Sequence, residues 1–106
     1  DLDRSVRFYR DGLGFEQEFV VEEYGWAQLM AGLVPVALYK PGQGGGSRTP
    51  GGSTDFHLQT DELEALQERL ESIGANIGGG IVKADDDVEY LEVQDPDGNV
   101  LRLTRD

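Results

Sequence analysis

His57 and Arg102 are the residues whose types and positions best support chemistry in this chain. His57 is the only histidine, and it lies two residues after Asp55. Because side chains alternate along a strand, His57 and Asp55 share one face of a strand predicted over residues 55–60. One imidazole and one carboxylate are too few ligands for a divalent metal site. His57 as a general base stays open as an alternative, although no residue pair in the sequence marks a base and the group that orients it.

Arg102 follows a segment whose residue types predict a tight turn. Residues 95–99 read DPDGN, in which proline presets φ and glycine and asparagine tolerate positive φ. The segment predicts a tight reversal between two strands, at residues 88–93 and 100–104. Alternation then places Leu101 and Leu103 on one face of the second strand and Arg102 on the other.

Periodicity and turn residues predict the elements that must position these side chains. Leucines at 63, 66 and 70, followed by Ile73, predict an amphipathic helix over residues 61–73 with Asp61 as its N-cap. The other predicted elements are a helix at residues 3–11, strands at 15–22, 24–31 and 34–39, and two further strands at 55–60 and near 76–83. A connector rich in Gly, Ser and Pro covers residues 41–53.

The order of these elements predicts an internal duplication within one domain spanning residues 1–106. The second half, residues 54–106, is a complete βαβββ unit. The first half, residues 1–40, has the same order without an opening strand. We therefore expect two modules joined by the connector at residues 41–53.

Composition narrows the possible partners. The formal charge of −12 would repel phosphate backbones and anionic lipid headgroups, so we expect neither nucleic acid nor membrane as a partner. The absence of cysteine excludes disulfides and thiolate metal sites. No apolar run approaches the length of a membrane span, and no secretion signal opens the sequence, which predicts a cytoplasmic protein.

Several short motifs carry a resemblance to a known family. They are DLDRS at residues 1–5, FY at 8–9, LGF at 13–15, IGA at 73–75 and DPDGN at 95–99. In this order and spacing they resemble the vicinal oxygen chelate superfamily, which includes glyoxalase I, bleomycin resistance proteins and extradiol dioxygenases. The resemblance implies an α+β fold in which paired βαβββ modules form a curved, mostly antiparallel sheet around a cleft. Relative to that fold, we expect this chain to lack the first strand of module one.

The resemblance also implies where a metal would be held. Metal-dependent members place ligands on the first and last strand of each module, and three of those positions align here with Ala37, Asp55 and Arg102. Alanine has no donor atom and a guanidinium repels a cation, so we expect no metal and no cofactor. If Arg102 and Asp55 lie on neighbouring strands, they either pair partly buried where the ion would otherwise lie or form a solvated surface pair, and the sequence leaves both open.

The favoured hypothesis is a metal-free protein that binds a small molecule, as the bleomycin resistance branch does, without reacting with it. Aromatic walls and acidic groups would suit a cationic ligand, whereas Arg102 would suit a ligand carboxylate, and the sequence leaves both open. The residues expected to contact the ligand are Trp26, Gln28, Tyr39, Asp55, His57, Gln59, Tyr90, Glu92 and Arg102.

Two alternatives belong to other classes of protein. One is a lyase or dioxygenase that uses a divalent metal, or His57 as a base. The other is a non-catalytic interaction subunit. The resemblance also predicts a homodimer, with units exchanged or sheets joined between chains.

Overall fold

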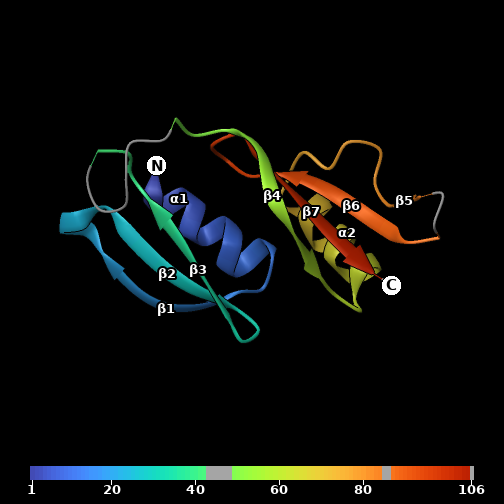
Figure 1. Ribbon diagram of the computed structural model, residues 1–106, viewed down its shortest axis with the longest axis horizontal. Coiled ribbons are helices and arrows are strands. Elements are labelled where there is room, and N and C mark those ends of the chain that lie inside the picture. The colour runs from blue at the N-terminus through green and yellow to red at the C-terminus, as the bar shows by residue number, and fades with distance from the viewer. Residues whose placement is uncertain (43–48, 85–86, 106) are drawn as a thin grey trace. The chain divides into compact units, whose positions relative to one another are not determined.

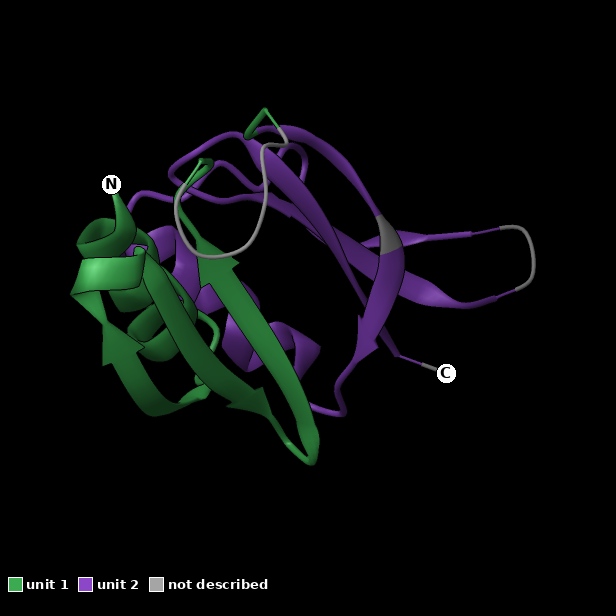
Figure 2. Ribbon diagram, turned by 60° about the vertical axis from the view of Figure 1, so that its left-hand side comes forward, with its two compact units in different colours: residues 1–50 green, residues 51–106 purple. Residues whose placement is uncertain are grey.

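The computed structural model describes residues 1–42, 49–84 and 87–105, apart from the side chain of Asp55 (Figure 1). Gly44 to Gly46 of the predicted connector and the aspartates at 85 and 86 thus lie outside the described residues. The chain divides into two compact units, Asp1–Pro50 and Gly51–Asp106 (Figure 2). Each unit has its own helix and its own sheet.

The first unit is a helix followed by a three-stranded antiparallel sheet with the strand order β1-β2-β3. Helix α1 begins after Asp1, whose carboxylate accepts a hydrogen bond from the backbone N–H of Arg4 at 3.2 Å. The elements are α1 at Leu2–Arg7, a π-helical turn at Phe8–Gly12, β1 at Glu16–Val21, a 3-10 turn at Glu22–Tyr24, β2 at Trp26–Ala31 and β3 at Val34–Tyr39.

The core of the first unit lies between α1 and the central strand. α1 packs against β2 and β3. Leu2 and Val6 are buried on the helix, and Ala27 and Leu29 are completely buried on β2. These side chains recur at helical spacing on α1 and alternate on β2, so one face of the sheet is covered.

The second unit is a strand, a helix and three further strands, as predicted. Its sheet has the order β4-β7-β6-β5, in which β4 pairs with β7 in parallel and the other pairs are antiparallel. The first and last strands of the unit are therefore neighbours. The elements are β4 at Gly52–Gln59, α2 at Leu63–Ser72, β5 at Val82–Lys83, β6 at Glu89–Gln94 and β7 at Asn99–Arg105.

The turn between β6 and β7 is held by the buried carboxylate of Asp95. One carboxylate oxygen accepts the backbone N–H groups of Asp97 and Asn99, each at 2.9 Å, and the other accepts the Asn99 side-chain amide at 2.8 Å. The side-chain amide oxygen of Asn99 accepts the backbone N–H of Gly51 at 2.9 Å. Gly98 has a φ of +87°, which glycine adopts without strain. The predicted hairpin is confirmed. Its turn also binds Gly51, the residue directly before β4.

Three local predictions differ from the structure, while the α+β class is confirmed. Helix α2 begins at Leu63 instead of after Asp61, because the Thr60 hydroxyl accepts the N–H of Glu62 at 3.1 Å and the chain bends there. The strand predicted near residues 76–83 is reduced to β5, since Gly78 and Gly80 have positive φ. Strand β4 includes Gly52 and Ser53, which the sequence pattern assigns to the connector.

Of the helices in the described residues, none combines the length and the apolar composition needed to cross a membrane.

Candidate functional site

The sheet of the first unit has one covered face and one open face. Ala27 and Leu29 point toward α1, so the alternating residues Trp26, Gln28 and Met30 point the other way and are half-buried. Strand register adds further side chains to the same open face. We call it the aromatic face, and its residues are Glu16, Phe19, Val21, Trp26, Gln28, Met30, Pro35, Ala37 and Tyr39.

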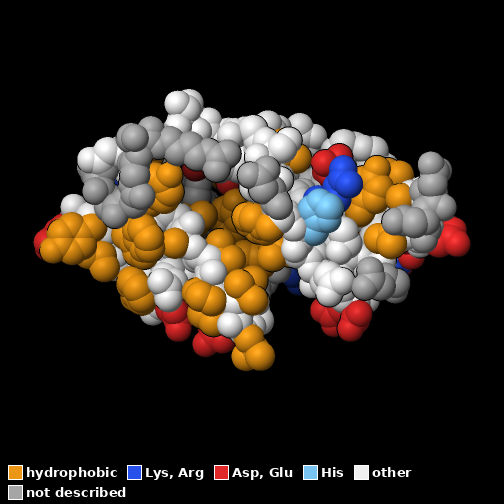
Figure 3. Space-filling view, viewed as in Figure 1, with side chains coloured by type: hydrophobic (Ala, Val, Ile, Leu, Met, Phe, Trp, Pro, Cys, Tyr) orange, Lys and Arg blue, Asp and Glu red, His pale blue; other side chains and the backbone are white. Residues whose placement is uncertain are grey.

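Two aromatic rings lie stacked on the aromatic face. The centroids of Trp26 and Tyr39 are 6.4 Å apart with an interplanar angle of 22°. Beside them the Gln28 amide donates to the Glu18 carboxylate at 2.8 Å, and Phe19 keeps 44% of its surface exposed. Hydrophobic side chains gather over the strands of this unit (Figure 3). The structure thus brings together Trp26, Gln28 and Tyr39, three of the predicted ligand contacts.

The sheet of the second unit has an open face of opposite character. Leu91, Leu101 and Leu103 are buried on the covered face, and α2 packs against β6 and β7. On the open face, His57 and Glu92 flank Arg102 in register. Gln59 and Tyr90 lie one step along the strands, both in register with Thr104. We call this set the polar face, and its residues are His57, Gln59, Tyr90, Glu92, Arg102 and Thr104.

Arg102 lies over an aromatic ring on the polar face. Its guanidinium carbon lies 4.3 Å from the centroid of the Tyr90 ring, within the range of a cation–π contact. One guanidinium nitrogen donates to the Glu92 carboxylate at 3.4 Å, and these side chains are 38% and 49% exposed. Such an exposed and long ion pair contributes at most about 1 kcal/mol. The prediction that Arg102 projects from the face opposite the leucines is confirmed.

The predicted pairing of Arg102 with Asp55 stays a prediction. The backbone of Asp55 belongs to β4, but its side chain lies outside the described residues. The register of β4 against β7 shifts between Ser53 and His57, and it is His57 that lies opposite Arg102. The two-residue alternation of a strand does not predict this irregularity, because a shift in register changes which residue of β4 lies opposite Arg102.

The donor set does not fit the divalent metal that the family resemblance implies. Ala37 offers no ligand atom, and the guanidinium of Arg102 offers no lone pair and carries a positive charge. Among the described residues, no three His, Cys, Asp or Glu side chains cluster in a way that could hold an ion. The strand neighbour of His57 is Arg102, a pure donor, so it cannot accept the ring N–H as the orienting group of a general base does.

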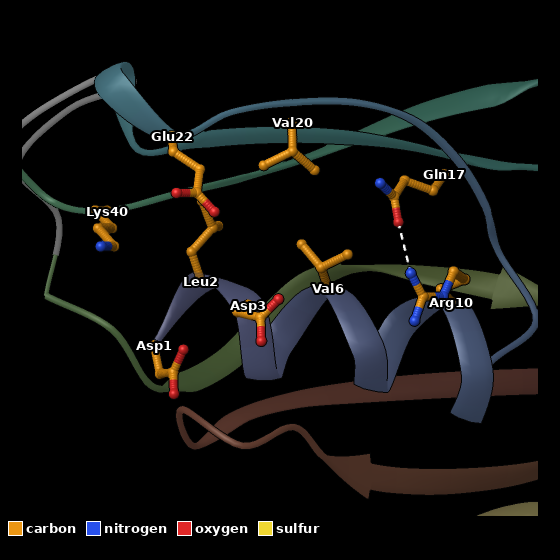
Figure 4. Close-up of a pocket in the computed structure, with 9 residues that line it drawn as sticks. All are labelled: Asp1, Leu2, Asp3, Val6, Arg10, Gln17, Val20, Glu22 and Lys40. Carbon is orange, nitrogen blue, oxygen red and sulfur yellow. Dashed lines mark hydrogen bonds between the residues drawn. The ribbon is translucent and has the colours of Figure 1, made fainter.

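A pocket of about 350 Å³ lies on the covered side of the first sheet, between α1 and β1 (Figure 4). Val20 shows which side this is, because it lies in register with the buried Ala27. The pocket is therefore separate from the aromatic face. Apolar side chains and carboxylates both line it, namely Leu2, Val6, Val20, Asp1, Asp3 and Glu22.

A polar bridge closes one end of this pocket. The Arg10 guanidinium donates to the Gln17 side chain and to Asp11, both at 2.8 Å. The hydrogen bond from Arg10 holds the pKa of the Asp11 carboxyl below its usual range. Sequence reasoning missed this pocket. The spacing of Leu2, Val6 and Arg10 marks one stripe of a helix, but nothing local tells which strand that stripe faces.

Comparison with known proteins identifies the family. The profile of the Glyoxalase/Bleomycin resistance protein/Dioxygenase superfamily matches residues 1–103. The chain therefore belongs to this superfamily, and the resemblance seen in the sequence is confirmed. A search of the curated proteins finds no match.

Solved structures share the fold. A superfamily member from Sphaerobacter thermophilus is 24% identical with a TM-score of 0.85, over 100% of this chain and 89% of its own. An integron cassette protein from the Halifax Harbour sewage metagenome is 27% identical with a TM-score of 0.75, over 99% of this chain and 89% of its own. A lactoylglutathione lyase from Agrobacterium tumefaciens is 19% identical with a TM-score of 0.81, over 99% of this chain and 85% of its own.

Proposed function

We propose that this protein binds a small organic molecule without a metal and without transforming it. The observation that carries the proposal is the aromatic face, where Trp26 and Tyr39 stack on an open side of the sheet. Small-molecule sites are mostly apolar, with a few placed polar groups that fix orientation. Gln28 supplies such a group beside the two rings.

The exposed aromatic surface gives a ligand a source of binding free energy. Aromatic pairs keep preferred stacked or edge geometries, and a flat ligand can extend such a stack. Covering about 100 Å² of apolar surface contributes on the order of 2.5 kcal/mol. The sheet already fixes the strands that carry Trp26 and Tyr39, so binding orders few additional side chains.

The chemistry of the donor set supports binding over metal-dependent catalysis. The lactoylglutathione lyase from A. tumefaciens shares the fold, but at 19% identity that likeness carries no activity to this chain. Alanine at position 37 and arginine at position 102 replace the side chains that metal-dependent members use, as the resemblance aligns them. We therefore expect no divalent ion to raise the thermal midpoint of the purified protein.

Trp26 makes the proposal directly testable, because it is the only tryptophan in the chain. A panel of flat organic molecules, added during fluorescence and thermal-shift measurements, should include compounds that quench Trp26 and raise the thermal midpoint. Trp26→Phe should keep the midpoint shift, and Trp26→Ala should weaken binding by roughly tenfold or more. Tyr24→Ala is the matched control, since Tyr24 is 64% exposed in the 3-10 turn outside the sheet.

Specific outcomes would overturn this function. A bound stoichiometric metal in the purified protein, with loss of stability on chelation, would support a metal enzyme instead. A ligand-induced shift in thermal midpoint that is equal in wild type, Trp26→Ala and Tyr24→Ala would place binding elsewhere. A panel with no effect at all would remove small-molecule binding as the function.

A homodimer is the second candidate use of the same surface, and the exposed apolar residues favour it. Phe19 is 44% exposed on the aromatic face, and contiguous apolar surface commonly marks interfaces. Light scattering over a range of micromolar concentrations tests this directly. A dimer that Phe19→Ser dissociates would support an interface at the aromatic face, and a monomer at all concentrations would exclude it.

A further inference from the structure

A β-bulge in β1 determines which side chains of that strand lie on the aromatic face. The register against β2 shifts between Gln17 and Phe19, so Glu18 is the extra residue between them. Gln17 lies in register with the buried Leu29, and strict alternation would place Phe19 on that covered side too. Because the bulge adds one residue, Phe19 lies instead on the same face as Glu16.

The bulged residue itself places a negative charge beside the aromatic rings. The Gln28 amide donates to one carboxylate oxygen of Glu18 at 2.8 Å. Gln28 lies two residues from Trp26 on the same face of β2, a spacing of about 7 Å along a strand. An amide group is neutral, so this hydrogen bond fixes the position of the Glu18 carboxylate without neutralising its charge.

Basic side chains lie on the other side of this sheet. In the part of the first unit that the structure describes, they are Arg4, Arg7, Arg10 and Lys40. The first two belong to α1, which packs on the covered face, and the other two line the pocket on that same side (Figure 4). The aromatic face thus combines two stacked rings with the carboxylates of Glu16 and Glu18.

From this arrangement we propose that the ligand of the aromatic face is a flat organic cation. The inference rests on the proposed small-molecule binding and names its ligand class. The faces of Trp26 and Tyr39 attract positive charge, and an aromatic cation can also extend their stack. The Glu18 carboxylate supplies the complementary charge beside Trp26. A ligand carboxylate at the same place would meet two like charges, those of Glu16 and Glu18.

Two substitutions at Glu18 test the charge. Glu18→Gln retains an oxygen that accepts the Gln28 amide and removes only the charge, so a flat cation should bind about three- to fivefold more weakly. Glu18→Lys should reverse the preference, so that an anion binds more tightly than a cation. Glu18 is exposed on an edge strand, and both variants should therefore keep the thermal midpoint of wild type.

The experiment uses three probes that share one ring system and differ in charge: 1-methylquinolinium, quinoline and quinoline-3-carboxylate. Affinities are measured by NMR titration of the full chain at neutral pH and physiological salt, where exposed charges more than about 8 Å apart are largely screened. The indole N–H of Trp26 is the reporter, since the chain has only this tryptophan. We expect wild type to bind the cation roughly tenfold more tightly than quinoline, and the carboxylate least.

Asp3→Asn is the matched control. It removes an exposed carboxylate of the same unit, on α1 and in the lining of the pocket, on the other side of the sheet. We expect this variant to leave all three affinities unchanged. If it weakens binding of the cation while Glu18→Gln does not, the cation binds in the pocket and the inference is overturned.

The remaining outcomes separate the inference from the proposed function. Loss of affinity for the cation alone in Glu18→Gln, with the reversed preference in Glu18→Lys, supports the inference. Equal affinities of wild type for the three probes overturn it, while their shift of the Trp26 signal still supports small-molecule binding at the aromatic face. If none of the probes moves that signal, the flat cation is excluded, and the wider thermal-shift panel judges the proposed function by itself.

Discussion

The two sheets share their architecture on the covered face and differ on the open face. In the first unit, Leu29 is buried under α1 while Trp26 lies on the other side of the same strand. In the second unit, Leu91 is buried on the covered face while Glu92 lies on the other side. The covered faces are both aliphatic. The open faces are aromatic in one unit and charged in the other.

This difference separates the residues that maintain the fold from those free to specialise. A helix over a sheet needs aliphatic side chains at alternate strand positions, whatever the function. The intervening positions carry no such requirement. In the first unit these positions carry two stacked aromatic rings, and in the second they carry an arginine that lies over a tyrosine ring. We therefore expect substitutions on covered faces to change stability and substitutions on open faces to change binding.

The largest effects should come from the covered faces of the two units. Leu29→Ala and Leu91→Ala each leave a cavity at a completely buried position, so each should lower the free energy of unfolding by about 2–5 kcal/mol. Urea denaturation followed by circular dichroism measures both. A loss under about 1 kcal/mol in either variant would show that its sheet is not packed as described.

Two aspartates of the second unit differ in what their side chains hold. The buried Asp95 carboxylate accepts three hydrogen bonds in the β6–β7 turn, so Asp95→Ala should cost about 1–3 kcal/mol in the same assay. Asp61→Ala is the matched control, because Asp61 is exposed and does not cap α2, and it should stay within about 0.5 kcal/mol. Equal losses in the two variants would contradict the turn network.

A smaller effect should appear in the acid range. The hydrogen bond from Arg105 lowers the pKa of Glu64 in the folded state, from an ordinary value of 4.5. The stabilisation is then present above that ordinary value and is lost as pH falls through the depressed folded value. Wild type should therefore be more stable than Glu64→Gln at pH 7, and the difference should shrink toward pH 3. A difference in urea midpoint that is constant from pH 7 to pH 3 would contradict this coupling.

The smallest effect should come from the tip of the β2–β3 turn in the first unit. Leu33 is 95% exposed there, so Leu33→Ser should change the free energy of unfolding by no more than about 0.5 kcal/mol. Chemical denaturation and light scattering are measured together. A loss above about 1 kcal/mol, or a change in oligomeric state, would mean that this tip is covered in solution.

Much of the fold follows from local signals that the sequence carries. The DPDGN turn specifies a hairpin by its own dihedral preferences, and the leucines of α2 specify which helix face is buried. Two predictions of element boundaries were wrong where another local feature determines the path of the backbone. The Thr60 hydroxyl moved the start of α2 past Asp61, and the glycines at 78 and 80 shortened a predicted strand to β5.

The candidate site was only partly predictable for a related reason. Alternation assigned Trp26, Gln28 and Arg102 to open faces, because a strand has a period of two residues. It did not reveal that Tyr90 supports the Arg102 guanidinium, since that contact depends on side-chain direction across two strands. Nor did it reveal the pocket between α1 and β1, whose walls come from separate elements.

By itself, the sequence determined the types of element, their order, their buried faces and the family, because these depend on periodicity and on turns within a few residues. Only the tertiary structure decided that β4 pairs with β7 in parallel, that His57 lies opposite Arg102, and that Arg105 binds Glu64 and Glu89 while Arg102 lies over the Tyr90 ring. These facts depend on contacts between residues far apart in the chain. Such contacts form only when the covered faces have packed and brought the strands into one register.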